Sequence, residues 1–346
     1  MIENYPMQPG AGKGRRQVRI LFTCAGRRVE LIQAFLRAGR ALGLKVIAHA
    51  ADTEAHFATG CLASKSHRVP ATTNPSYIPK LLAIVRRYKI DLLVPLLDME
   101  LAKLADARAA FGKVGCGVLV SSPEVVRICR DKLATFDFLT RNNIDTPMTW
   151  PAAMLQKKSR HNFPYFLKPR KGSASKGNFV LRNKSDLLAL VPQVPEAIIQ
   201  EYVEGVEYTL DVYSGLDGKP RCAVPRRRLE VRGGEVTRAS TYWHKDIIQA
   251  GLRVVEALGE CVGVITIQLI MAPEGRIRII EINPRFGGGV PLAIQAGADF
   301  PKWLLMEWLG RRPRIRLSQF RSGVIMLRYY QAYFVHDSER MGSKGS

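Results

Sequence analysis

The sequence predicts a mixed fold in which an N-terminal parallel α/β unit precedes a larger α+β unit. Residues 18–50 indicate strand, helix and strand in turn, which is the pattern of a parallel sheet. Residues 264–271 and 277–283 are apolar strands joined by a tight turn, which indicates an antiparallel hairpin. With 346 residues, the chain is long enough for two or three packed units.

The N-terminal unit is expected to span residues 17–121. Residues 1–16 are rich in proline and glycine and lack an apolar period, so we expect a disordered tail there. β-Branched runs then alternate with amphipathic segments, as in a parallel α/β sheet. The expected strands are 18–22, 45–50, 91–97 and 117–121, and the expected helices are 29–42 and 77–88.

A dinucleotide site is one alternative for this unit, because the acidic residue Asp52 follows the second strand. The fingerprint of such a site needs three glycines after the first strand, and only Gly26 stands in that loop. The unit is therefore expected to be mainly architectural. A weaker substrate role stays open for Arg27, Asp98 and Glu100, which lie at strand ends.

Composition narrows the functional class. The net charge of +22 suits nucleic-acid binding, but the basic residues are spread along the chain without a recognisable nucleic-acid-binding motif, so we expect no such partner. No apolar run is long enough to cross a bilayer, and no signal peptide opens the chain. The six cysteines are scattered singly, which is typical of a reducing compartment, so we expect a cytoplasmic protein without zinc or disulfides.

The second unit opens with residues that favour a helix start. Residues 121–124 supply a serine cap followed by proline and glutamate. Asp131 and Lys132 follow as a helical pair, which in isolation would be a routine surface ion pair. Residues 163–169 then indicate a strand that carries Lys168 near its end.

A loop of small residues, 170–177, follows this strand. Small side chains let successive backbone N–H groups close around phosphate oxygens, while Lys168 supplies a point charge. The loop lacks the P-loop pattern, and a flexible turn is the alternative interpretation. The candidate loop residues are Gly172, Ser173, Ser175 and Gly177.

Residues 197–212 indicate two strands joined by a short loop, with the spacing Q-E-Y-V-x-G-x-E-Y. A hinge that binds a nucleoside needs an acceptor for the base amino group, a backbone donor and an acid for the ribose hydroxyls. A polar hairpin is the alternative, and the spacing favours the nucleoside site.

The strand that ends at Asn283 carries the strongest motif. Side chains two residues apart project to one face, so Glu281, Asn283 and Arg285 are expected to lie together. The turn at residues 272–275 is expected to bring Gln268 opposite Glu281. Carboxylate and amide oxygens suit Mg²⁺, and a guanidinium suits phosphate, whereas the alternative is a solvated edge strand.

These motifs together resemble the nucleotide and magnesium site of the ATP-grasp superfamily, and in particular one synthetase unit of the carbamoyl phosphate synthase large subunit. The resemblance covers roughly residues 18–335 and implies a pre-ATP-grasp α/β domain followed by a two-subdomain ATP-grasp fold. It implies a ligase that uses ATP to activate a carboxylate as an acyl phosphate for attack by an amine. Because this chain holds a single synthetase unit, a stand-alone carboxylate–amine ligase is expected.

The resemblance also implies cofactors and a role for each motif. The cofactors are ATP and Mg²⁺ or Mn²⁺, with two ions. The implied metal ligands are Gln268, Glu281 and Asn283, and the catalytic cations are Arg285 and Lys168. The implied phosphate ligands are Lys132, Lys168 and the four loop residues above. The implied adenine contacts are Gln200, Glu201 and Val203, with Glu207 at the ribose.

The ATP-grasp domain is expected at residues 122–335, with a lid subdomain at about 146–203 and a disordered tail at 336–346. Arg226 and Arg228 share one face of a strand, where they either bind a substrate anion or lie on a solvated edge. The remaining expected helices are 185–191, 247–259, 290–297 and 300–309, and a last strand is expected at 323–335.

Two other functions stay open on the sequence alone. The first is an ATP-binding protein without ligase turnover, which an added acid and amine would not stimulate. The second is a basic nucleic-acid-binding protein, whose affinity would fall steeply with salt. The expected partners of the ligase are a small carboxylate and an amine, with no membrane, and a homodimer is compatible with the sequence.

Overall fold

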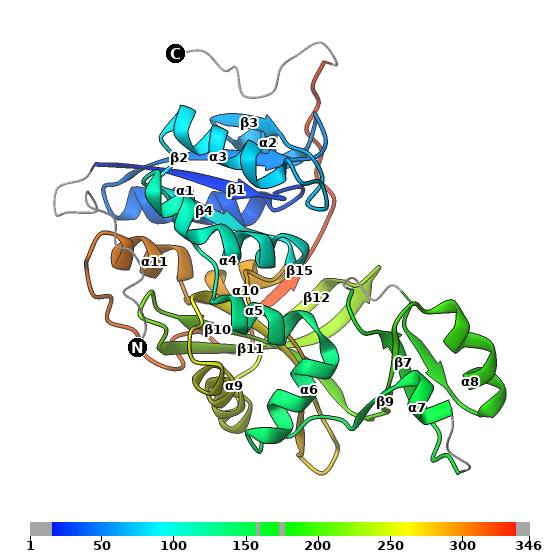
Figure 1. The fold of residues 1–346 in the computed structure, drawn as a ribbon. Helices are drawn as coiled ribbons and strands as arrows, with labels where there is room; N and C mark the ends of the chain where they lie inside the picture. Colours follow the sequence, from blue (N-terminus) through cyan, green and yellow to red (C-terminus); the bar gives the residue numbers. More distant parts are fainter. Residues whose placement is uncertain (1–15, 157–159, 173–176, 337–346) are drawn as a thin grey trace.

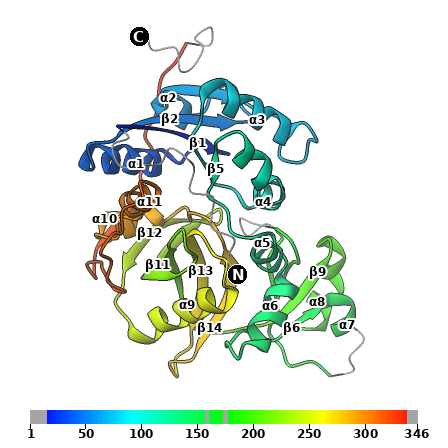
Figure 2. The same cartoon turned by 60° about the vertical axis from the view of Figure 1, so that its left-hand side comes forward.

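The computed structural model describes residues 16–156, 160–172 and 177–336, which form three sheets with flanking helices (Figure 1). Figures 1 and 2 show the N-terminal sheet and its helices above a six-stranded sheet, with a smaller four-stranded unit to one side. A parallel α/β sheet is thus followed by antiparallel sheets, and the predicted fold class is confirmed.

The N-terminal sheet is parallel and has the strand order β3-β2-β1-β4-β5. Its strands are β1 (Gln17–Thr23), β2 (Lys45–Asp52), β3 (Lys65–Arg68), β4 (Leu92–Pro95) and β5 (Gly117–Val118). Its helices are α1 (Val29–Ala41), α2 (Ala58–Leu62), α3 (Tyr77–Tyr88) and α4 (Asp98–Lys113). β3 and α2 were not predicted, because each is too short to show a period of its own.

Two short helices, α5 (Pro123–Arg130) and α6 (Lys132–Arg141), connect the N-terminal sheet to the rest. Ser122 caps α5, where its hydroxyl accepts a hydrogen bond from Val125 N (3.3 Å). The prediction of a helical pair at Asp131 and Lys132 is wrong, because the chain is extended at Asp131. The Asp131 carboxylate caps α6 by accepting from Leu133 N at 3.0 Å.

The four-stranded sheet is antiparallel and has the order β6-β9-β7-β8. Its elements are β6 (Thr149–Pro151), α7 (Ala152–Gln156), β7 (Tyr165–Pro169), β8 (Phe179–Leu181), α8 (Lys184–Leu190), the 3-10 turn η1 (Val191–Gln193) and β9 (Ala197–Glu201). A small core of its own, which includes Leu155, Leu167 and Ile199, holds this unit together. Figure 1 shows the unit projecting from the main body, so it is packed mostly against itself.

The six-stranded sheet is antiparallel and has the order β14-β13-β10-β11-β12-β15. Its strands are β10 (Val206–Ser214), β11 (Pro220–Arg232), β12 (Glu235–Thr241), β13 (Gly263–Met271), β14 (Ile277–Asn283) and β15 (Ile325–Leu327). Its helices are α9 (Lys245–Leu258), α10 (Val290–Gln295) and α11 (Phe300–Trp308).

The predicted last strand, 323–335, is wrong over most of its length, because β15 pairs with β12 over three residues only. Figure 1 shows the chain leaving the sheet after β15, and most of the large side chains there are exposed, so nothing packs this segment into a longer strand.

The N-terminal sheet and the six-stranded sheet share one hydrophobic core. The Phe35 ring of α1 lies 5.1 Å from the Phe22 ring of β1 and 5.8 Å from the ring of Phe286, which follows β14. Phe286 is buried against the N-terminal unit, so the polar end of β14 is held beside the ends of the N-terminal strands.

The six cysteines are all free, and four of them are buried. Burial raises the pKa of the Cys222 thiol to about 12, so it is an inert core side chain. None of the helices in the described part of the chain combines the length and apolar composition needed to cross a bilayer.

Candidate active site

The hairpin of β13 and β14 brings the strongest sequence motif together. Gln268 pairs with Glu281 across the two strands, and Thr266 pairs with Asn283. The turn closes with Ala272 N donating to Arg276 O at 2.9 Å. The register shifts by one residue between Gln268 and Leu269, so a bulge in β14 precedes Glu281 and restores the predicted alignment.

The donor set at this hairpin is one carboxylate and two amide oxygens. Gln268 Oε1 accepts from Arg228 Nη1 at 3.2 Å, and Asn283 Oδ1 accepts from Arg285 Nη2 at 3.5 Å. In the described residues, the Glu281 carboxylate has neither a hydrogen-bond donor nor a cation in contact. Such oxygens fit Mg²⁺, which takes one or two carboxylates from a protein and its remaining ligands from phosphates and water.

No cluster of three or more His, Cys, Asp or Glu side chains that could hold a metal ion by itself occurs in the described parts of the chain. An ion at Glu281 would take its other ligands from amide oxygens such as those of Gln268 and Asn283, and from water or a bound phosphate.

Arg226 and Arg228 are buried, so the alternative of a solvated strand edge is wrong. Arg226 is 1% exposed and forms a bidentate pair with Asp211, through Nε to Oδ2 (2.7 Å) and Nη2 to Oδ1 (3.1 Å). Arg228 contacts Glu207 at 2.8 Å. The two strands β10 and β11 therefore carry two adjacent ion pairs, one fully desolvated and one partly open.

The glycine run after β14 makes room for these polar side chains. A Cβ at Gly287 would lie 2.7 Å from Thr266 Oγ1, and one at Gly289 would lie 2.1 Å from Arg226 Nη1. The φ angle of Gly289 is −90°, so its lack of a side chain serves close approach rather than an unusual backbone angle.

Lys168 is buried in β7 and faces β9. Its Nζ donates to Gln200 Oε1 at 2.9 Å, and Gln200 Nε2 donates to Thr149 Oγ1 at 2.8 Å. Burial lowers the pKa of Lys168 to about 8, and the nearby Glu281 carboxylate offsets part of this effect. The lysine is thus a cation held inside the protein, where its ammonium contacts β9.

Lys132 lies beside the small-residue loop, where its Nζ donates to Gly172 O at 3.1 Å. The loop is also tied to the start of α6, because Arg170 contacts Asp131 at 2.7 Å. Gly172 and Gly177 have φ angles of +155° and +73°, which glycine adopts without strain. The predicted loop residues Ser173 and Ser175 lie outside the described residues.

The predicted hinge follows β9. Glu201 contacts Arg278 Nη1 at 2.5 Å and accepts from Met148 N at 3.2 Å. The Gln200 side chain is occupied by Lys168, so a base in this hinge would meet backbone groups near Val203 rather than the Gln200 amide. Burial raises the pKa of Glu207, while Arg228 opposes the shift.

Arg285 reaches across to the N-terminal unit, where its Nη2 donates to Asp98 Oδ2 at the start of α4. It lies close enough to Asn283 to contact its side chain. The sequence predicts Arg285 as a catalytic cation beside the metal ligands and leaves only a weaker substrate role open for Asp98, and it does not predict the contact between the two. The G-R-R sequence that places Arg28 after β1 was a signal that could have pointed to a second cation here.

Two acidic residues of the N-terminal unit have structural roles. Asp52 accepts from Gly26 N at 2.8 Å and from Thr53 N at 2.8 Å, so it shapes two loops. Glu100 is fully buried and accepts from Tyr77 Oη at 2.6 Å. Burial raises the pKa of Glu100. These hydrogen bonds account for the acidic side chains of Asp52 and Glu100 without a bound dinucleotide or a substrate.

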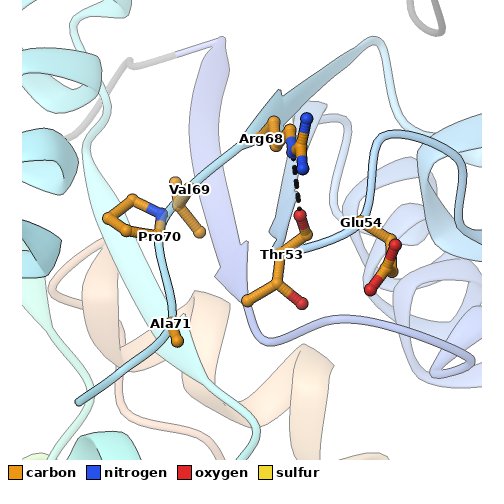
Figure 3. A pocket seen from close by; sticks show the side chains of 6 residues that line it. All are labelled: Thr53, Glu54, Arg68, Val69, Pro70 and Ala71. Carbon is orange, nitrogen blue, oxygen red and sulfur yellow. Dashed lines mark hydrogen bonds between the residues drawn. The ribbon is translucent and has the colours of Figure 1, made fainter. Parts of the chain in front are cut away.

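A hollow of about 470 Å³ lies at the carboxyl ends of β2 and β3, and Figure 3 shows the side chains that line it. Arg68 Nε donates to Thr53 O across it at 3.1 Å. Its lining comes from residues 53–54 and 68–71 only, and none of the predicted site residues takes part.

Comparisons with known proteins match both the N-terminal unit and the unit that follows it. Residues 129–289 match the family described as "ATP-grasp domain", and residues 20–119 match "PylC-like, N-terminal domain". A 3-methyl-D-ornithine–L-lysine ligase of Methanosarcina barkeri is 26% identical over 216 residues, which is 62% of this chain and 54% of the relative. D-Alanine–D-alanine ligase A of Bacillus cereus is 26% identical over 160 residues, 40% of this chain and 52% of the relative. The chain spans about half the length of the curated relatives it matches.

Solved structures show the same fold at low identity. Biotin carboxylase from Campylobacter jejuni has a TM-score of 0.69 at 17% identity, covering 86% of this chain and 73% of the other. An L-amino acid ligase from Bacillus licheniformis has a TM-score of 0.68 at 17% identity, covering 85% of this chain and 75% of the other. Since the two family matches fall on successive parts of this fold, the chain carries an ATP-grasp domain at residues 129–289, preceded by a PylC-like N-terminal domain at residues 20–119.

Proposed function

We propose that this protein is an ATP- and Mg²⁺-dependent ligase, which activates a small carboxylate as an acyl phosphate for attack by an amine. The observation that carries the proposal is the β13–β14 pairing, which sets Gln268 opposite Glu281, two pairs away from Asn283. The relatives that match in sequence are named as ligases that join amino acids, which supports this reaction class.

The proposed metal ligands are Gln268, Glu281 and Asn283, for two Mg²⁺ or Mn²⁺ ions. The metal, when bound, offsets the negative charge of the nucleotide phosphates. Glu281 is the carboxylate of the set and has no ion pair in the described residues, so its charge is available. Arg228 of β11 reaches across β10 and holds the Gln268 amide oxygen in place.

The proposed phosphate ligands are the cations around the loop. Lys168 points from β7, and with a pKa of about 8 its ammonium is mostly charged at neutral pH. Lys132 lies beside Gly172, and Arg285 lies beside Asn283 at the end of β14. The backbone of the loop from Gly172 to Gly177, with the predicted Ser173 and Ser175, would close over the phosphates and exclude water.

The nucleoside is proposed to lie in the hinge after β9. The base would contact backbone groups of Glu201 and Val203 near Gln200, and Glu207 would bind the ribose hydroxyls. The proposed domains are residues 17–121, 122–335 and a lid at about 146–203. We also propose a cytoplasmic location and a homodimer, which would have twice the 38.6 kDa mass of one chain in solution.

The test is Mg²⁺-dependent ADP release with a panel of small carboxylates, each paired with a panel of amines. Glu281→Gln keeps the size of the side chain and removes the charge, so it is expected to lower acid-stimulated ADP release at least about 100-fold. The control is Glu256→Gln on the exposed face of α9, which removes the same charge away from the site and is expected to leave the rate unchanged.

Stimulation by one acid that Glu281→Gln abolishes would support the ligase and identify its substrate. A variant that keeps the full rate would remove Glu281 from the metal site. Absence of nucleotide binding by the natural chain would overturn the proposed function altogether.

A further inference from the structure

Three arginines from distant parts of the chain gather at Gly288. A Cβ at Gly288 would lie 2.9 Å from Arg28 Nη1, and Arg328 Nη2 donates to Gly288 O. Arg285 Nη1 donates to Phe286 O, two residues earlier, at 3.2 Å. We call Arg28, Arg285 and Arg328 the arginine cluster. Its members come from the loop after β1, from the end of β14 and from the residue after β15.

The acidic side chains near the arginine cluster do not balance its charge. Asp98 is paired with Arg285, and Glu235 is shared, at 2.9 Å from Arg27 and 3.9 Å from Arg328. Arg28 has no hydrogen bond or ion pair from its side chain in the described residues. Two carboxylates therefore face three buried or half-buried guanidinium groups and an exposed fourth.

Repulsion between the guanidinium groups of the arginine cluster also lowers the pKa of one of its members. The pKa of Arg28 is lowered to about 10, first by burial and then by the charges of Arg285 and Arg328. In addition, the buried Nε groups of Arg285 and Arg328 lack a hydrogen-bond acceptor in the described residues. An anion that binds between these arginines would offset the repulsion between their positive charges and would accept hydrogen bonds from the N–H groups that lack an acceptor.

The position of the arginine cluster beside the proposed metal ligands indicates which anion it would bind. Arg285 Nη2 lies 3.5 Å from Asn283 Oδ1, so the cluster adjoins the proposed metal ligands. Arg28 and Arg328 extend it away from the β13–β14 hairpin, on the backbone of Gly288. An acid that is activated at the hairpin would therefore reach these two arginines with a different part of its structure.

We propose that the arginine cluster binds a second anionic group of the acid substrate, so that the substrate is a dicarboxylic acid or a phosphorylated acid. The inference rests on the proposed function, because it places the reacting carboxylate at the hairpin. A guanidinium binds carboxylate and phosphate with the same bidentate geometry, so both acids fit the cluster.

A direct binding measurement tests this proposal without requiring turnover. The full chain, saturated with Mg²⁺ and a non-hydrolysable ATP analogue, is titrated with glutarate, with inorganic phosphate and with butyrate as the matched monoanion. Glutarate or phosphate is expected to bind at least about 10-fold more tightly than butyrate. Binding of glutarate alone would indicate a dicarboxylic acid, and binding of phosphate alone a phosphorylated acid.

Substitutions assign the binding to the cluster. Arg28→Gln is expected to weaken the dianion about 10- to 100-fold, which is the usual effect of losing one charge-assisted contact. Arg28→Lys keeps the charge and should recover part of the affinity. The matched control is Arg40→Gln, at the exposed end of α1, which removes the same charge and should leave the affinity unchanged.

Steady-state kinetics complete the test. Among matched acids, the dianionic member is expected to stimulate ADP release at lower concentration, and Arg28→Gln should raise the KM for the acid while the KM for ATP stays within about twofold. Equal stimulation by monoanionic acids would overturn the inference and leave the ligase intact. Dianion binding that Arg28→Gln does not weaken would also overturn it. Failure of the chain to bind the nucleotide analogue would instead overturn the proposed function, and the inference with it.

Discussion

Replacing Gly289 with alanine tests the account of the glycine run. The backbone angles of Gly289 suit alanine, so the cost comes from the added methyl group alone. That methyl carbon would lie 2.1 Å from Arg226 Nη1, whereas ordinary van der Waals contacts begin at about 3.4 Å. The guanidinium must therefore move by more than about 1 Å.

Arg226 has little freedom to move. It is 1% exposed, and its partner Asp211 is fully buried and also accepts from Thr266 Oγ1 at 3.1 Å. Displacing the guanidinium breaks the bidentate pair and leaves two buried charges without compensation. Breaking a buried pair costs about 3–5 kcal/mol, so Gly289→Ala is expected to lower the free energy of unfolding by about 3 kcal/mol.

The assay is urea unfolding followed by circular dichroism. Gly112→Ala in helix α4 is the control, because nothing lies within 4 Å of its Cβ position, and it should be stabilising by about 1 kcal/mol. The coupling is measured by repeating Gly289→Ala in the Arg226→Met background, where most of the cost should disappear. An unfolding free energy of Gly289→Ala within about 0.5 kcal/mol of the natural chain would refute the reasoning.

Two further predictions concern protonation. The pKa of Lys168 is about 8, below the ordinary lysine pKa of 10.5, so its ammonium loses its proton as the pH rises through about 8. We therefore expect kcat/KM for ATP to fall above pH 8. A kcat/KM that stays constant up to pH 9 would contradict the proposed role of Lys168 in binding phosphate. His49 and His67 share a buried hydrogen bond of 2.9 Å, and burial lowers the pKa of each ring from 6.5 to about 4. The unfolded chain therefore binds more protons between pH 6.5 and pH 4, and stability is lost as pH falls through this window. Each ring should lower the free energy of unfolding by about 2 kcal/mol at pH 5 relative to pH 7, as measured by urea unfolding. The substitution His67→Phe should remove part of that loss of stability.

Much of the fold was predictable because local patterns coincide with the elements. Helix α3 begins and ends where the amphipathic period places it, and the β13–β14 hairpin follows from two apolar runs around a proline–glycine turn. The pairing of Gln268 with Glu281 was also predicted, but the turn alone does not produce it. The turn pairs Leu269 with Ile279, and only the bulge at Ile280 brings Glu281 opposite Gln268.

The sequence by itself determined that Gln268, Glu281 and Asn283 stand on two strands joined by a short turn, since the strand and turn patterns are properties of neighbouring residues. The tertiary structure alone decided that Arg226 is buried with Asp211, that Gln200 holds Lys168, and that Gly289 is small because a guanidinium packs on it. It also brought Arg28 and Arg328 to one glycine from positions 300 residues apart. Such contacts depend on how the sheets pack together, and the local pattern of apolar and polar residues does not predict that packing.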